Sequence, residues 1–161
     1  MVDASIITAL AYLHIIAAMG WLGAAALFVS VIAPGLRTVS PQASLEFLAK
    51  VAPKATRFFI GVSTATIIFG LALLFSSGVN DWSVYVGAAI GLIAYLDAML
   101  VTVPAFNKAD RLAANMLASP QTGPPPPEFT SSLRRGGIGV TLVVILLAIA
   151  AVFMVVSGFM F

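Results

Sequence analysis

The sequence has no cysteine, a single histidine and few charged residues. Without cysteine, disulfides, thiolate metal ligands, iron–sulfur ligation and a cysteine nucleophile are excluded. Only 9% of the 161 residues are charged, whereas 61% are hydrophobic. A soluble domain of this size needs a charged surface, which this chain lacks. The composition therefore indicates one compact domain in a membrane.

Four long apolar segments carry almost no charge, and each is close to or longer than the roughly 20 residues that a helix needs to cross a bilayer. We expect an all-α fold, an integral membrane four-helix bundle that forms a single domain over residues 1–161 and contacts the lipid bilayer directly. The expected spans are residues 4–33, 58–76, 84–104 and 136–161.

All eight Lys and Arg residues fall in two stretches, Arg37–Arg57 and Lys108–Arg135. The positive-inside rule then places loops 34–57 and 105–135 in the cytoplasm and both termini on the outer side. This is the pattern of a prokaryotic-type inner or plasma membrane protein. The cations flank apolar spans and form no stripe on a soluble face, so nucleic acid is not an expected partner.

The first cytoplasmic loop contains signals for a short helix. Pro34-Gly35 ends the first span, and Ser40-Pro41 is typical of an N-cap followed by a first-turn proline. Glu46 and Lys50 are spaced for an i,i+4 ion pair. The apolar residues of this helix share one face, so we expect it to lie along the membrane surface.

The third span is expected to end at Pro104, and residues 106–117 then continue with a helical pattern outside the membrane. In this pattern Asp110 lies with Lys108 on the polar side, opposite Phe106. Paired arginines at 134 and 135 mark the inner edge of the fourth span.

Small residues on two spans permit close helix packing, which membrane bundles need because lipid gives little hydrophobic incentive for helices to pair. They are Gly87-x-x-x-Gly91 on the third span and Gly20 on the first. We favour contacts within the chain for both. A homo-oligomer, or a subunit of a larger membrane complex, stays open.

Asp97 is an acidic residue about two turns inside the third span. An ionised carboxylate at that depth costs several kcal/mol, so it should face the bundle interior. Two interpretations stand side by side, a hydrogen-bond hub that joins three helices and a carrier of protons or cations. The hydroxyl residues expected at similar depth are Ser63, Thr64, Thr66 and Thr141.

His14 lies in the outer half of the first span, and Trp21 follows two turns later on the same face. A lone membrane histidine is more often a packing residue than a ligand. Counted from the outer end, however, Met154 on the fourth span lies at nearly the same depth. His14 and Met154 are therefore candidate ligands of haem iron, with Met160 joining them in a copper site.

The segment Leu13–Gly23 reads L-H-x-x-A-A-x-x-W-x-G. It resembles the first helix of the CopD-like (copper-resistance D) membrane proteins and of the HemJ-like protoporphyrinogen oxidases, which are modules of four or more membrane helices. In some members the first-helix histidine is implicated in haem binding. The resemblance thus implies that His14 is a ligand, with Trp21 beside the cofactor. The chain departs from the HemJ-like pattern in lacking further histidines and a buried lysine in its later spans.

Three functions follow in order of preference. The first is a CopD-like protein that binds haem b or copper, or an accessory subunit of a membrane redox complex in electron transport. The second is a small oligomeric transporter or channel, coupled to protons or cations through Asp97. The third is a HemJ-like oxidase. No Ser/His/Asp arrangement, P-loop or carboxylate pair is visible in the sequence, which excludes hydrolase and NTPase functions. We expect that the chain is not an enzyme by itself.

Overall fold

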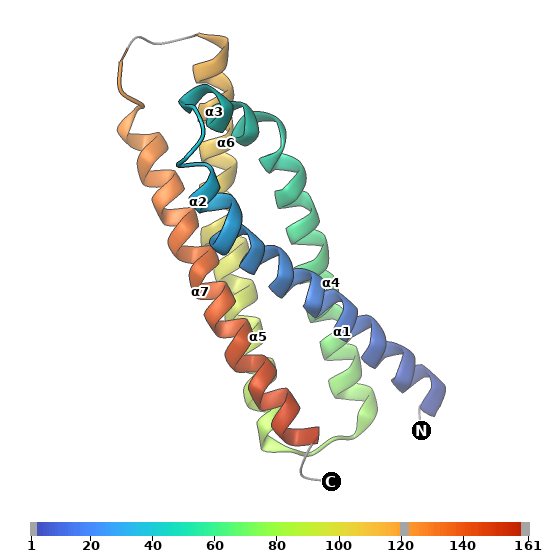
Figure 1. Ribbon diagram of the computed structural model, residues 1–161. Coiled ribbons are helices and arrows are strands. Elements are labelled where there is room, and N and C mark those ends of the chain that lie inside the picture. Colours follow the sequence, from blue (N-terminus) through green and yellow to red (C-terminus); the bar gives the residue numbers. More distant parts are fainter. Residues whose placement is uncertain (1–2, 120–122, 159–161) are drawn as a thin grey trace.

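The computed structural model describes residues 3–119 and 123–158, and every regular element in these ranges is a helix (Figure 1). The all-α prediction is confirmed. The elements are α1 (Ala4–Leu27), the π-helical turn η1 (Phe28–Ile32), α2 (Ala33–Gly35), α3 (Pro41–Lys50), α4 (Ala52–Ser77), α5 (Trp82–Asp97), the π-helical turn η2 (Ala98–Thr102), α6 (Val103–Ala118) and α7 (Pro127–Gly158).

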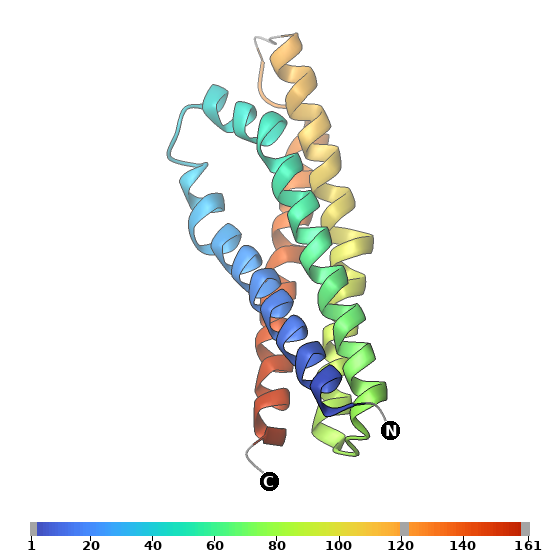
Figure 2. The same cartoon turned by 90° about the vertical axis from the view of Figure 1, so that its right-hand side faces the viewer.

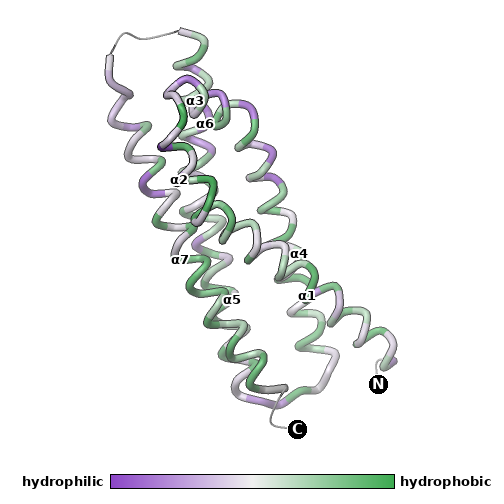
Figure 3. The backbone as a smooth tube through the Cα atoms, in the orientation of Figure 1, coloured by the Kyte–Doolittle hydropathy of each residue, from purple (hydrophilic) through white to green (hydrophobic). Residues whose placement is uncertain are grey.

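Four long rods make up the bundle, since α1, η1 and α2 are continuous and so are α5, η2 and α6. Each rod is long and apolar enough to cross a membrane. The beginning of α1 and the end of α7 lie at one end of the bundle, and α3 lies at the other (Figures 1 and 2). Apolar residues dominate the middle of the rods, and polar residues gather towards the α3 end (Figure 3). Four apolar rods of this length indicate a membrane protein.

The helices extend beyond the predicted spans. The fourth rod begins at Pro127 instead of near residue 136, and α4 begins at Ala52 instead of near residue 58. The third rod has 37 residues, so it is about 55 Å long and exceeds the roughly 30 Å of a hydrocarbon core. Much of the two expected loops is therefore helical and projects past the apolar segments.

Local signals read from the sequence place several helix ends correctly. The Ser40 side chain accepts a hydrogen bond from the backbone N–H of Ala43, so it caps α3 as predicted. The expected Glu46–Lys50 ion pair forms, with 3.7 Å between nitrogen and oxygen. Gly78 ends α4 in a left-handed conformation, φ 65°, that glycine adopts without steric cost.

Both π-turns come just before a proline. The turn η1 ends at Ile32, two residues before Pro34, and η2 ends at Thr102, two residues before Pro104. Proline has no N–H to donate, and its ring clashes with the carbonyl four residues earlier. The wider π-turn accommodates this clash without breaking the helix. Pro104 therefore lies within a continuous rod, in which the helical pattern expected for residues 106–117 follows without a break.

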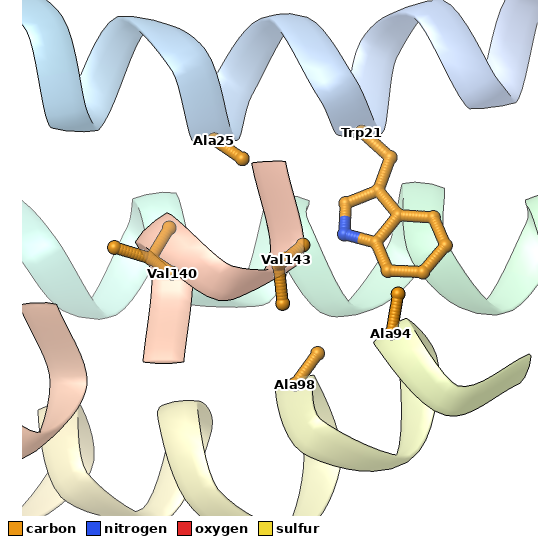
Figure 4. Close-up of a cluster of buried hydrophobic side chains, with 6 residues drawn as sticks. All are labelled: Trp21, Ala25, Ala94, Ala98, Val140 and Val143. Carbon is orange, nitrogen blue, oxygen red and sulfur yellow. The ribbon is translucent and has the colours of Figure 1, made fainter. Parts of the chain in front are cut away.

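Trp21 joins the two helix pairs of the bundle. Helix α1 packs mainly along α4, and α5 packs along α7. The Trp21 indole is fully buried and makes edge-to-face contacts with Phe59 and Tyr95 at centroid distances of 6.3 and 6.4 Å. The ring belongs to a buried cluster with small side chains of α1, α5 and α7, of which Ala94 lies beside the ring in Figure 4, and this packing fixes where α1 crosses the bundle. These small side chains are Ala25, Ala94, Ala98, Val140 and Val143.

Helix α3 packs against α6. Leu48 on its apolar face is only 3% exposed, whereas Val51 is 47% exposed. The extension of α6 past the apolar segment gives α3 a protein surface to cover. The resulting second core cluster consists of Leu48, Ala52, Ala109, Ala113 and Phe129.

The glycine pattern serves contacts within the chain. A Cβ on Gly87 would lie 3.1 Å from Cγ of Met154 on α7, and a Cβ on Gly20 would lie 3.3 Å from a methyl group of Val62 on α4. Gly91 has open space around it. Gly87 and Gly20 therefore let neighbouring helices approach, as preferred from the sequence.

Candidate functional site

Asp97 is the last residue of α5, and its carboxylate is held by the π-turn that follows. The hydroxyl of Thr102 donates a hydrogen bond to Oδ2 of Asp97 over 3.0 Å. Residues five apart do not share a face of an α-helix, where the neighbours are three and four apart. The extra residue in the π-turn brings Thr102 round to Asp97. The turn before Pro104 thus creates a carboxylate–hydroxyl pair in the membrane.

Gly139 on α7 makes room for this pair. A Cβ at this position would lie 3.3 Å from Oδ2 of Asp97 and would collide with Oγ1 of Thr102. Two residues earlier on the same helix, a Cβ on Gly137 would meet nothing within 4 Å. Only a glycine at 139 lets α7 pack this closely against the pair.

Asp97 opens onto a groove between the third rod and α7. Its first cavity, of about 270 Å³, also contains Arg134 and Arg135. The ion pairs of the described residues are Glu46–Lys50 and Lys108–Glu128, so the Asp97 carboxylate is not ion-paired there. Besides these three residues, the cavity is lined by Val101, Ser131, Ile138, Gly139 and Leu142.

The hydroxyl residues expected around Asp97 bind elsewhere. Ser63, Thr66 and Thr141 each donate to a backbone carbonyl three or four residues earlier on their own helix. Thr64 pairs with the Tyr95 hydroxyl over 3.2 Å. The expected hub of three helices is therefore wrong, because helical hydroxyls bind the carbonyls of their own preceding turn. Thr102 takes their place.

His14 lies in the contact between α1 and α4. Its Nδ1 is 2.9 Å from the backbone carbonyl oxygen of Thr66, so Nδ1 carries the proton and donates. A Cβ on Gly70 would lie 2.8 Å from Cε1 of the ring, so the imidazole fits against α4 only because residue 70 is glycine. The bond leaves the lone pair of neutral imidazole on Nε2. This arrangement serves helix packing, and it is also the one that metal-ligating histidines adopt.

Of the other proposed site residues, Met154 and Trp21 pack against other parts of the bundle. Met154 packs against Gly87 on α5, and the first half of α1 diverges from the last turns of α7 in both views (Figures 1 and 2). Trp21 lies in the core, where its side chain is fully buried. Met160 is outside the described residues. Within those residues, no three His, Asp or Glu side chains are grouped closely enough to hold a metal ion.

Asp110 is a buried acid that the sequence placed on the polar side of its helix. It is 5% exposed, and neither carboxylate oxygen has a hydrogen-bond partner among the described residues. It lies beyond Pro104, in the charged part of α6 outside the apolar segment. Burial raises the pKa of Asp110 to about 6. The assignment failed because the pattern of α6 alone does not reveal that α3, α4 and α7 all pack on it.

Comparison with protein-family models, with curated proteins and with solved structures finds no match for this chain.

Proposed function

We propose that this chain is an integral protein of a prokaryotic-type inner or plasma membrane, with both termini outside and the α3 end in the cytoplasm. The distribution of charge supports this orientation. All eight Lys and Arg residues lie in α3, in its flanking segments, or in the parts of α4, α6 and α7 nearest to it. Basic segments beside membrane spans stay on the cytoplasmic side.

Within that membrane, we propose that Asp97 carries protons. The observation behind this proposal is a membrane carboxylate that accepts one hydrogen bond, from Thr102, and opens onto a groove. Ionisable residues inside membrane proteins mark pathways for protons, ions or substrates. Arg134 and Arg135 line the same groove, and their positive charges disfavour a metal cation beside the Asp97 carboxylate. A proton neutralises the carboxylate without needing such a site.

The test is proton flux into proteoliposomes that contain the purified chain and a pH-sensitive dye. Wild-type protein should conduct protons under an applied potential, and Asp97→Asn should abolish the flux. Asparagine keeps an oxygen that accepts the Thr102 hydrogen bond, so the variant should fold. Glu46→Gln, on the exposed side of α3, is the control and should conduct as the wild type does. Equal flux in wild type and Asp97→Asn rejects the proposal.

A second candidate is a CopD-like redox protein that binds haem b or copper through His14. The specific observation in its favour is the Nδ1–Thr66 bond, which leaves Nε2 available as a ligand atom. The chain has a single histidine, so a haem with two histidine ligands would need a second copy or a partner subunit. Bound haem b would supply one-electron transfer, and the chain itself would act as an accessory subunit.

Visible absorption of the purified protein tests this second candidate. A haem protein shows a Soret band, which should disappear in His14→Ala and persist in Met154→Leu if the second ligand comes from another chain. Metal analysis after addition of Cu(I) tests copper in the same pair of variants. A wild-type protein without a Soret band and without bound copper removes this candidate and leaves the Asp97 proposal untouched.

A further inference from the structure

A second cavity continues the groove towards the basic end of the bundle. It has a volume of about 400 Å³ and shares Val101, Ser131 and Arg135 with the cavity at Asp97. It lies between the third rod and the first turns of α7, and it does not include Asp97. The remaining lining residues are Leu100, Pro104, Ala105, Lys108 and Ser132.

The cavity carries positive charge that the protein itself does not neutralise. Lys108 is paired with Glu128 at 3.0 Å. Arg135 lies on both cavities, is exposed, and forms no ion pair within the described residues, and the same is true of its neighbour Arg134. Guanidinium groups bind phosphate oxygens with two parallel hydrogen bonds.

Apolar residues lie next to this charge, on the side that faces lipid. Leu100 is 68% exposed and Ile138 is 60% exposed. Both lie nearer to the middle of the apolar segments than Lys108 and Arg135 do. A phospholipid has a charged phosphate at the membrane surface and an acyl chain below it. Its charged and apolar parts therefore follow the same order along the membrane normal as these residues do.

We propose that this groove binds an anionic phospholipid. The headgroup phosphate contacts Arg135 and Lys108 in the second cavity, and an acyl chain lies along Leu100 and Ile138. Arg134 and Arg135 select an anionic lipid over a zwitterionic one because their charge is otherwise uncompensated. The proposal goes beyond the role of Asp97, since the lipid contacts are made by other residues.

Binding is measured by native mass spectrometry of the full-length protein in detergent, titrated with phosphatidylglycerol, phosphatidylcholine or inorganic phosphate. We expect phosphatidylglycerol to bind more tightly than phosphatidylcholine. Arg135→Gln should weaken phosphatidylglycerol binding about fivefold, the typical effect of one basic residue near a membrane surface. Arg135→Lys should restore most of it. Arg111→Gln, which removes an exposed charge of α6 outside both cavities, is the matched control and should bind normally.

Equal binding of phosphatidylglycerol by wild type and Arg135→Gln overturns the proposal, and so does equal affinity for phosphatidylcholine. Inorganic phosphate that binds as tightly as the lipid indicates a site for free phosphate and also overturns it. Asp97→Asn separates the two proposals. It should abolish proton flux and leave phosphatidylglycerol binding intact.

Discussion

The Thr102 hydroxyl reaches the Asp97 carboxylate across one π-turn, and Gly139 on the facing helix leaves space for both. The relationship links a backbone irregularity to a membrane carboxylate. Pro104 requires the wide turn, the turn brings the hydroxyl to the acid, and the glycine lets α7 close over the pair. A substitution of Thr102, Pro104 or Gly139 should therefore change the surroundings of the Asp97 carboxylate.

Gly139→Ala should separate Thr102 from Asp97 and destabilise the bundle. The added methyl group has no room beside Oγ1 of Thr102, and overpacking of this kind costs about 1–3 kcal/mol. Gly137→Ala is the matched control on the same helix. Its Cβ meets open space, so the higher helix propensity of alanine should stabilise α7 by up to about 1 kcal/mol. Unfolding in detergent micelles measures both, and equal stability of the two variants contradicts this account.

Gly70→Ala should displace the His14 imidazole from α4. The new Cβ would lie under 3 Å from two ring atoms, so the ring must rotate away and lose its bond to the Thr66 carbonyl. On the same helix, Gly61→Ala places its Cβ in open space and serves as the control. Nitrogen NMR of the single histidine reports the change, because the tautomer fixed by the Nδ1 hydrogen bond gives distinct ring shifts. Wild-type shifts in Gly70→Ala would contradict the packing described here.

The elements that the sequence predicted correctly are those that the membrane dictates. Long uncharged segments must become helices, because only helices satisfy the backbone in lipid without a partner strand. The Asp97–Thr102 pair could not be found in this way, since five residues is not a helical spacing. The signal that the sequence does offer for this pair is Pro104, which distorts the turn before it. The burial of Asp110 depends on neighbouring helices that one helical pattern does not show.

Trp21 should tolerate phenylalanine far better than alanine. The indole is fully buried, yet its Nε1–H has no hydrogen-bond partner in the described part of the chain. Trp21→Phe removes that unsatisfied donor along with part of the ring, so the two effects oppose each other and the change in stability should be small. Trp21→Ala leaves a cavity where α1 crosses the bundle and should cost about 3–5 kcal/mol. Unfolding in micelles measures both, and a Phe variant as unstable as the Ala variant would show that the indole N–H is bonded.

Asp110 should make the protein less stable at neutral pH than at mildly acidic pH. Burial raises the pKa of Asp110 from 3.8 to about 6 in the folded state. The folded state therefore holds this proton more tightly than the unfolded state does. The resulting stabilisation is fully present below pH about 4 and is lost as the pH rises through about 6. A pKa difference of about 2 corresponds to at most about 3 kcal/mol.

Asp110→Asn keeps the shape of the side chain and removes its titration. The variant should be more stable than wild type at pH 7, and the difference should shrink as the pH falls from 7 to 4. Glu46→Gln, at the exposed ion pair of α3, is the control for general acid effects and should follow the wild-type profile. Unfolding measured across this pH range decides the matter. A constant difference between Asp110→Asn and wild type would mean that the carboxyl of Asp110 titrates normally, so that water or a cation reaches it inside the contact between α6 and its neighbours.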